Sequence, residues 1–162
     1  THCISSAASD VYKRQHHMGT VIETQKDTER LIENTHESVK LTLDTGHMLF
    51  AKGDSKSILQ NYYERILHVH CKDIRKQVLE KSLKEDLSFR GAFLEGAFTV
   101  PGDGCIDYQP LFNVLKNNNY SGWLVVEAEQ DPAKANPLEY AKIGYKYLTD
   151  TLKKSEIEIY KN

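Results

Sequence analysis

The sequence predicts an α/β fold, the C-terminal half of a TIM (β/α)8 barrel. The first observation is that short apolar runs of β type alternate with helical segments, which indicates βαβ units and a parallel sheet. The second is length: three strands are clear and a fourth is weaker in a chain of 162 residues. A complete barrel of this type needs about 250 residues. We therefore assign residues 16–152 to part of such a barrel.

The strands are predicted from their apolar and β-branched residues. A weak strand lies near His16–Ile22, and the first clear strand is Val39–Thr45. The second clear strand is Ile66–Cys71. The third, Trp123–Ala128, is almost continuously apolar, which is typical of a strand that is covered on both faces.

Four helices are predicted from apolar residues at helical spacing: Ser55–Glu64, Lys76–Leu87, Tyr108–Lys116 and Pro137–Leu152. Ser55 or Asp54 suits the N-cap of the first, and Pro137 suits the first turn of the last. The Gly-rich stretch Ser88–Asp107 is predicted to be a long loop. Its segment Phe98–Gly104 is interpreted as a lid over a cleft, with a plain surface loop as the alternative.

The two ends of the chain differ in character from the rest. Residues 1–15 are small and polar and then basic, without an amphipathic period. We predict a non-native or disordered leader there and exclude it from the fold, with a frayed native terminus as the alternative. Residues 153–162 are charged and are predicted to form a loose tail.

Composition excludes several classes of function. Charged residues make up 27% of the chain and the formal net charge is -2, so neither nucleic acid nor an anionic membrane is an expected partner. No apolar run approaches the ~18 residues of a membrane span. The three cysteines lie far apart without a CxxC pair. This pattern argues against a disulfide framework or a zinc finger and favours a reducing cytoplasmic location.

Each clear strand ends in ionisable side chains. The first ends at Asp44, the second carries His70, and the third ends at Glu127. Because the carboxyl ends of all barrel strands lie on one face, these three side chains are predicted to converge there. Carboxylate and imidazole groups are suitable ligands for a divalent Mn, Co, Zn or Mg ion, so we interpret the three residues as a metal site.

Other residues near the strand ends are secondary candidates. His68 points to the same side of its strand as His70 and would order that ligand from behind. His17 or Glu23 is a candidate fourth ligand, and Arg75 is a candidate anchor for a polar substrate. Each has an ordinary alternative, because lone acidic residues after strands commonly cap helices or form surface ion pairs. A lone histidine in a strand is commonly a hydrogen-bonded core residue.

Five strings carry a family resemblance: His17–Thr20, Asp44–His47, His68–Asp73, Phe98–Asp107 and Val126–Pro137. Together they resemble the inosose dehydratase family of myo-inositol catabolism, which belongs to the xylose-isomerase-like superfamily of TIM barrels. The strings Asp-Thr-Gly-His and His-x-His-x-Lys-Asp are shared across that superfamily. FTVPGDG and EAEQDPAKANP are much more specific to the dehydratase branch. The resemblance covers about His16 to Leu148.

The resemblance implies dehydration of a small cyclitol, 2-keto-myo-inositol (scyllo-inosose), to a trihydroxycyclohexane-1,2-dione. It implies Mn²⁺ or Co²⁺ as the metal, and glutathione as an associated cofactor. By motif, the superfamily's metal ligands match Asp44, His70 and Glu127, and the positions near the substrate match His47, Lys72, Arg75 and Glu129. Gln15 stands where the family has a further histidine.

From these matches we predict that His47, Lys72 and Glu129 are catalytic and that Arg75 and His17 bind substrate. Loss of a hydroxyl β to a ketone requires a base for the α-carbon proton and an acid for the departing hydroxyl. A divalent ion stabilises the negative charge that develops on the ketone oxygen. The sequence does not assign acid and base among the three catalytic candidates.

Two alternatives stay open. A metal-dependent sugar isomerase or epimerase of the same superfamily would use the same ion and cleft without loss of water. The other alternative is an inactive half-barrel, because half a barrel leaves its outer strands as unpaired edges. A homo-oligomer is one way in which such edges would be covered.

Overall fold

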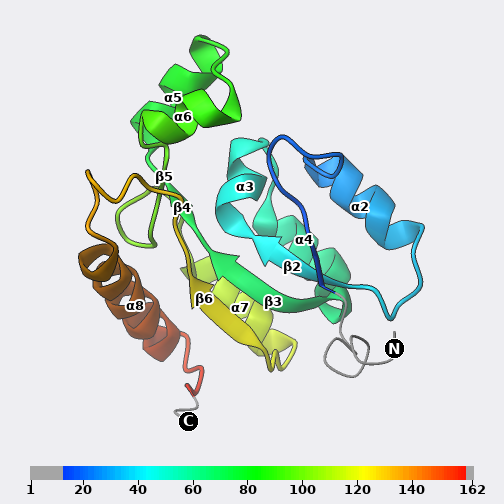
Figure 1. The fold of residues 1–162 in the computed structure, drawn as a ribbon. Helices are drawn as coiled ribbons and strands as arrows, with labels where there is room; N and C mark the ends of the chain where they lie inside the picture. Colours follow the sequence, from blue (N-terminus) through cyan, green and yellow to red (C-terminus); the bar gives the residue numbers. More distant parts are fainter. Residues whose placement is uncertain (1–12, 160–162) are drawn as a thin grey trace, which may run out of the picture.

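The computed structural model describes residues 13–159, so most of the predicted leader lies outside the described part of the chain. Four parallel strands form the central sheet, in the order β1 (Lys13–Gln15), β2 (Lys40–Asp44), β3 (Ile66–Cys71) and β6 (Trp123–Val126). Helices alternate with these strands along the chain (Figure 1). The predicted partial TIM barrel, with parallel strands and intervening helices, is confirmed.

The weak strand expected near His16–Ile22 was misplaced. The strand is formed earlier, by Lys13–Gln15, which pairs in parallel with β2. The chain then turns away from the sheet, because a backbone hydrogen bond of 3.0 Å closes residues 17–22 and Gly19 takes a left-handed φ of 76°. Three residues of the predicted leader thus belong to the sheet, while the nature of residues 1–12 stays a prediction.

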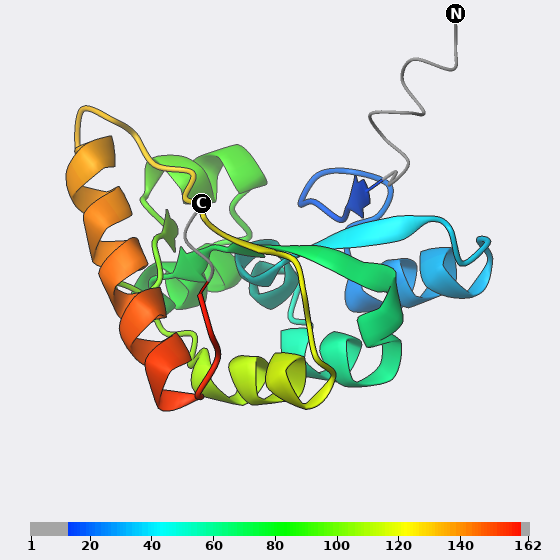
Figure 2. The same cartoon turned by 90° about the horizontal axis from the view of Figure 1, so that it is seen from below.

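One face of the sheet is covered by the helices α2 (Gln25–Glu33), α4 (Ser55–Tyr62), α7 (Gln109–Asn117) and α8 (Pro137–Lys154) (Figure 2). Alternate strand residues point into the core beneath these helices and are buried: Leu41, Leu43, Val69 and Cys71. The residues between them point to the opposite face: Thr42, Asp44, His68 and His70. The sheet therefore has an apolar face under helices and a polar face without them.

The edge strand β6 differs from its prediction. It pairs with β3, and its first residue, Trp123, is 64% exposed. The almost continuous apolar run was expected to be covered on both faces, and this was wrong because helices cover only one face of the sheet within residues 13–159. None of the helices described there is long and apolar enough to cross a membrane.

A smaller unit lies beyond the carboxyl ends of the main strands (Figure 1). It contains α3 (Thr45–Phe50), α5 (Lys76–Lys84), α6 (Phe89–Leu94) and the antiparallel pair of β4 (Asp73–Ile74) and β5 (Phe98–Thr99). A second apolar cluster holds this unit together: Phe50, Ile74, Ala92, Ala97 and Phe98. This unit frames one side of the polar strand ends.

The prediction of a loop over Ser88–Asp107 was wrong as far as Thr99, because this part contains α6 and β5. Ser88 begins the helix, because its hydroxyl accepts a hydrogen bond of 3.1 Å from the backbone N–H of Gly91. Of the glycines that suggested a loop, Gly91 lies within α6, whereas Gly96 and Gly102 take left-handed φ values of 81° and 88° outside the helix.

The four predicted helices are confirmed with shifted ends. The first is followed by a 3-10 turn, η1 (Tyr63–Arg65), and the second ends at Lys84 because Asp86 takes a left-handed φ of 52°. Helices α2 and α3 were not predicted. The start of α2 carries a capping box, in which the side chains of Thr24 and Asp27 each accept a hydrogen bond from the other residue's backbone N–H.

The predicted loose tail was wrong as far as residue 159. Helix α8 continues through Lys154, and Ser155 is buried and hydrogen-bonded to the side chain of Gln109. Ile157 packs against the main core. The prediction followed the many charged residues of this segment and overlooked Ser155 and Ile157, which attach it to α7 and the main core.

Candidate active site

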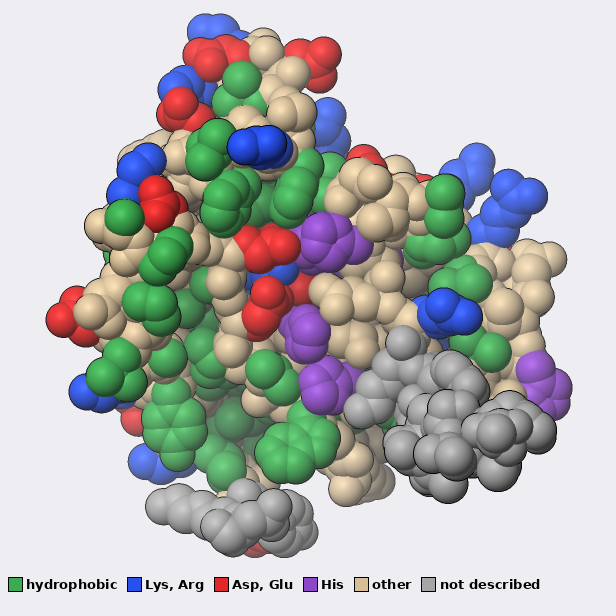
Figure 3. Space-filling model, in the orientation of Figure 1, with side chains coloured by type: hydrophobic (Ala, Val, Ile, Leu, Met, Phe, Trp, Pro, Cys, Tyr) green, Lys and Arg blue, Asp and Glu red, His purple; other side chains and the backbone are tan. Residues whose placement is uncertain are grey.

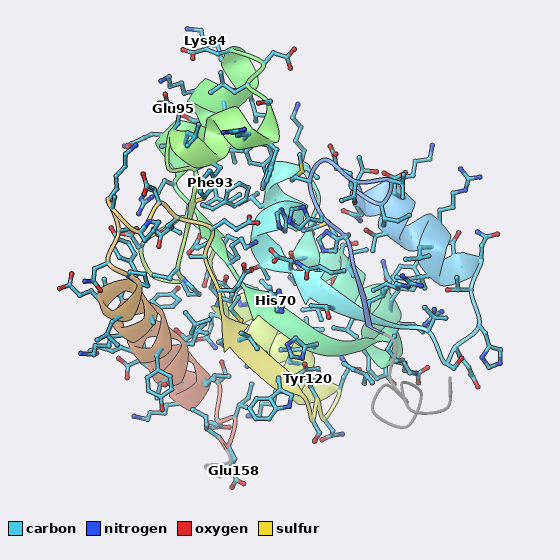
Figure 4. The ribbon with its side chains drawn as sticks, viewed as in Figure 1. His70, Lys84, Phe93, Glu95, Tyr120 and Glu158 are labelled. Carbon is cyan, nitrogen blue, oxygen red and sulfur yellow. The ribbon has the colours of Figure 1, made fainter. Side chains whose placement is uncertain are left out.

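The polar face of the sheet gathers acidic and histidine side chains near the strand ends, with a basic group among them (Figure 3). Asp44 is the last residue of β2 and also the N-cap of α3, where it accepts a hydrogen bond of 3.0 Å from the N–H of His47. His70 stands beside Asp44 in the sheet register and is central on this face (Figure 4). Glu127 follows β6 directly, with its N–H bonded to the carbonyl of Cys71 at 3.3 Å.

The three predicted metal ligands therefore lie together. Nδ1 of His70 is 3.6 Å from Oδ2 of Asp44 and 3.6 Å from Oε2 of Glu127. One ligand atom from each residue lies within 4.8 Å of the others. Nδ1 of His70 is buried and has no partner in hydrogen-bond geometry within the described structure, whereas the buried Oε2 of Glu127 is ion-paired with Lys72. Buried polar atoms without hydrogen bonds are costly, and this donor set suits a divalent cation.

Lys72 lies at the centre of the acidic group and is 1% exposed. Its Nζ is 3.3 Å from Oδ2 of Asp44, 2.9 Å from Oε2 of Glu127 and 3.0 Å from Oε2 of Glu129. The same Nζ is 2.9 Å from Nε2 of His47. Burial alone would lower the pKa of Lys72, but the facing carboxylates outweigh it and raise that pKa above its ordinary value.

Burial and neighbouring charges shift the pKa values of the other site residues in different directions. Burial alone would raise the pKa of Asp44, but the adjacent His70 side chain and the charge of Lys72 hold that pKa well below its ordinary value. Burial raises the pKa of Glu127, against the opposing charge of Lys72. Burial lowers the pKa of His47 to about 3, so this imidazole is neutral at neutral pH. The site thus combines carboxylates, a charged amine and a neutral imidazole.

A second group of possible metal ligands adjoins the first: His17, His47 and Glu129. Nε2 of His17 is 3.3 Å from Oε1 of Glu129, and Nε2 of His47 is 3.5 Å from its Oε2. The rings of His17 and His47 are 3.7 Å apart between centroids. The predicted substrate ligand His17 thus joins two of the predicted catalytic residues.

The backbone around Lys72 is fixed by hydrogen bonds. The N–H of Lys72 donates to Oγ1 of Thr45 (3.1 Å), and that hydroxyl donates to the Lys72 carbonyl (2.6 Å). The hydroxyl of Tyr108 donates to the same carbonyl at 3.0 Å. Gly46 leaves room for the aliphatic stem of Lys72, because a Cβ there would lie 2.7 Å from its Cγ. These contacts direct the ammonium toward the strand ends.

Two residues of β1 and the following turn were missed as site residues. Nε2 of Gln15 donates to Oδ2 of Asp44 at 3.1 Å, and the N–H of Asp44 donates to Nε2 of His16 at 3.2 Å. Burial lowers the pKa of His16 to about 4. A strand that pairs in parallel with β2 ends at the same edge of the sheet as Asp44. Recognition of that pairing would therefore have placed Gln15 and His16 at the site.

Two other candidates are placed outside these groups. Glu23 accepts a hydrogen bond of 2.8 Å from the N–H of Gly19 and so closes its own turn. Arg75 donates to the carbonyl of Gly96 (2.7 Å) and to the side chains of Asp103 (2.6 Å) and Thr99 (3.1 Å). Its guanidinium therefore ties the start of α5 to the segment around β5, and its substrate-binding role stays a prediction.

Comparisons with known proteins identify relatives over most of this chain. An inosose dehydratase of Clostridium beijerinckii is 53% identical over 136 residues, which cover 83% of this chain and 46% of that protein. An inosose dehydratase of Lactiplantibacillus plantarum is 49% identical over 138 residues, which cover 85% of this chain and 46% of that protein. The chain spans about half the length of the relatives that it matches.

Solved structures share the fold at low sequence identity. The IOLI protein with a binding zinc atom matches with a TM-score of 0.67 and 19% identity, over 95% of this chain and 53% of that one. The probable 3-DHS dehydratase AsbF of Bacillus anthracis matches with a TM-score of 0.64 and 20% identity, over 91% and 52%. An L-ribulose 3-epimerase matches with a TM-score of 0.61 and 17% identity, over 94% of this chain and 50% of that one.

A family model described as "Xylose isomerase-like TIM barrel" matches residues 13–151, from β1 into α8. The matched region contains the whole polar face and both groups of possible ligands. The chain belongs to the xylose isomerase-like TIM barrel family.

Proposed function

We propose that this chain, alone or within a longer protein, contributes the active site of a metal-dependent hydro-lyase. The reaction is dehydration of 2-keto-myo-inositol to a trihydroxycyclohexane-1,2-dione, in myo-inositol catabolism. The observation that carries the proposal is the meeting of Asp44, His70 and Glu127 beside a Lys72–Glu129–His47 group. The relatives named inosose dehydratase, at 49% and 53% identity, support this substrate.

Asp44, His70 and Glu127 would hold the metal. The fit rests on the buried Nδ1 of His70, which has no hydrogen-bond partner within the described residues and lies 3.6 Å from both Oδ2 of Asp44 and Oε2 of Glu127. We propose Mn²⁺ or Co²⁺ there, and the zinc atom bound by the IOLI protein supports a divalent ion in this fold. When bound, such an ion supplies charge stabilisation at the ketone oxygen of the substrate.

Exposure distinguishes the groups that a substrate can touch. Side chains of His17 and Glu129 are 32% and 26% exposed, whereas Lys72 and His47 are almost completely buried. We therefore assign proton exchange with the substrate to Glu129, a carboxylate that accepts a proton and returns it. His17 orients the substrate's hydroxyls, and the buried Lys72 and His47 hold the Glu129 carboxylate in place.

The test is Mn²⁺ binding by calorimetry together with dione formation from scyllo-inosose. Asp44→Asn and Glu127→Gln are expected to lose both, because each removes a charged ligand. Asp150→Asn is the matched control, since Asp150 pairs with Lys146 on the exposed side of α8. Unchanged Mn²⁺ binding in both ligand variants would overturn the proposal.

An epimerase or isomerase is the second candidate, favoured by the match to the L-ribulose 3-epimerase fold. Such an enzyme moves a proton without losing water. Product analysis separates the two, because a dehydratase releases a dione from inosose while an epimerase returns an isomer of a ketose. Glutathione dependence, a cytoplasmic location and a homo-oligomeric state stay predictions. Light scattering of the purified chain tests the alternative of an inactive half-barrel.

A further inference from the structure

The Lys72 ammonium touches the same oxygens that the proposed metal ligands offer. It lies 3.3 Å from Oδ2 of Asp44 and 2.9 Å from Oε2 of Glu127. These two atoms are also the ones that lie 3.6 Å from Nδ1 of His70. A divalent cation held by these residues would therefore compete with the ammonium for one pair of carboxylate oxygens.

We propose that Lys72 sets the metal affinity of this site, because its ammonium must leave Asp44 and Glu127 before a divalent cation can take those oxygens. The inference rests on the proposed metal site but concerns its control and not its ligands. A positive charge beside a divalent cation in a buried site repels it strongly, so the cost of binding includes the displacement of the ammonium.

The structure provides a place for the displaced ammonium. Oε2 of Glu129 lies 3.0 Å from Nζ, and Nε2 of His47 lies 2.9 Å from it, and neither atom belongs to the Asp44–His70–Glu127 group. The stem of Lys72 is held against Gly46 and its backbone is bonded to Thr45. Only the end of the side chain needs to shift: the ammonium keeps its contacts with Glu129 and His47 and leaves Asp44 and Glu127.

Charge balance supports one divalent cation beside a retained ammonium. Three carboxylates, those of Asp44, Glu127 and Glu129, surround the single ammonium of Lys72. The three carboxylates and the ammonium together carry an excess of two negative charges, which one divalent ion would neutralise. The second possible ligand group, around His17, is therefore assigned to the ammonium and the substrate.

Calorimetric titration of the 162-residue chain with Mn²⁺ tests the proposal. Lys72→Met keeps most of the buried stem and removes the charge, and it is expected to bind Mn²⁺ on the order of tenfold more tightly than the wild type. Lys76→Met is the matched control, because Lys76 is an exposed lysine of α5 that contacts only Glu80 at 3.9 Å among its ion pairs in the described structure. The control is expected to change the affinity by less than about twofold.

The coupling between Lys72 and Glu129 gives a second measurement. Glu129→Gln removes the charge that receives the ammonium, so it is expected to weaken Mn²⁺ binding in the wild type. In the Lys72→Met background the same change is expected to have a smaller effect, because no ammonium remains to be accommodated. Equal effects of Glu129→Gln in both backgrounds would contradict the proposal.

A spectroscopic readout needs no substitution. Zn²⁺ added to ¹⁵N-lysine-labelled chain is expected to move the Nζ resonance of Lys72 and leave that of Lys76 in place. The proposal is overturned if folded Lys72→Met binds Mn²⁺ with wild-type or weaker affinity, or if the Lys72 resonance does not respond to bound Zn²⁺. If neither the wild type nor Lys72→Met binds a divalent ion, the proposed metal site is wrong, and the proposed competition is then wrong as well.

Discussion

The two faces of the parallel sheet are built from alternate residues of the same strands, yet one face is apolar and covered by helices and the other carries ionisable side chains. Leu43 and Val69 are 1% exposed beneath helices, in a core of closely packed apolar side chains. Asp44 and His70, each one residue further along, belong to a face of ionisable side chains, where the buried Nδ1 of His70 has no hydrogen bond within the described residues. The helix side therefore supplies the stability on which the polar side depends.

The largest expected effect separates the two faces directly. Leu43→Ala removes buried apolar volume and is expected to lower the free energy of unfolding by about 2–5 kcal/mol. His70→Ala is expected to change it by less than about 1 kcal/mol without metal, because the Nδ1 of His70 has no hydrogen bond to lose. Urea denaturation of both variants measures the difference, and a larger loss in His70→Ala would contradict this division between the faces.

The pH dependence of stability tests the buried imidazole of the polar face. The folded pKa of His16 is about 4, against 6.5 in the unfolded chain, so the unfolded state binds more protons between these values. Stability from the neutral ring is fully present above pH 6.5 and falls as the pH decreases toward 4. We expect a loss of about 2 kcal/mol between about pH 7 and pH 5 from this residue.

His16→Gln is the matched variant for that experiment, since glutamine also offers an acceptor for the N–H of Asp44. Its unfolding free energy is expected to decline less steeply over the same interval of pH. Parallel slopes in the two proteins would show that His16 is not the group that titrates.

Tyr108 joins the faces and is expected to give an intermediate effect. The residue packs in the main core, while its hydroxyl donates to the carbonyl of Lys72 at 3.0 Å. Tyr108→Phe keeps the ring and leaves that carbonyl with fewer partners, which is expected to cost about 1–2 kcal/mol of unfolding free energy. Thermal denaturation measures it. An effect as large as that of Leu43→Ala would contradict the view that the hydroxyl contributes only a hydrogen bond to the polar face.

A small effect is expected at Gln15, on the edge of the polar face. Gln15→Ala removes one hydrogen bond to Oδ2 of Asp44 and is expected to lower the unfolding free energy by about 1 kcal/mol. Gln15→Glu is the more informative variant, because it adds a carboxylate beside Asp44 and is expected to lower the stability further at neutral pH. Equal stabilities of the two variants would contradict this view of the edge.

The spacing of apolar residues predicted the four helices and the three clear strands, and the shared direction of the strands predicted where their ends meet. Asp44, His70 and Glu127 could be brought together because parallel strands share one carboxyl edge. The sequence did not locate β1, whose three polar residues carry no β pattern and owe their strand to pairing with β2. The family match placed Gln15 at the position of a histidine, but exclusion of residues 1–15 from the fold left it without a predicted contact.

Other misses have local causes. Helix α2 is mostly polar, and its capping box and the buried face of Thr28 and Ile32 were signals that were not used. The role of Arg75 could not be foreseen because its partners, Gly96 and Asp103, lie more than twenty residues away along the chain. Lys72 was recognised as a site residue through the family motif, but its position between the carboxylates follows only from the fold.

Trp123 has a practical consequence. It is the only tryptophan of the sequence, lies beside His68 in the sheet register, and is 64% exposed. Its fluorescence is therefore an intrinsic optical reporter for this edge of the molecule. Emission at long wavelength is expected from the isolated chain, and a blue shift would record, without any attached dye, the arrival of whatever polypeptide shields the indole from water.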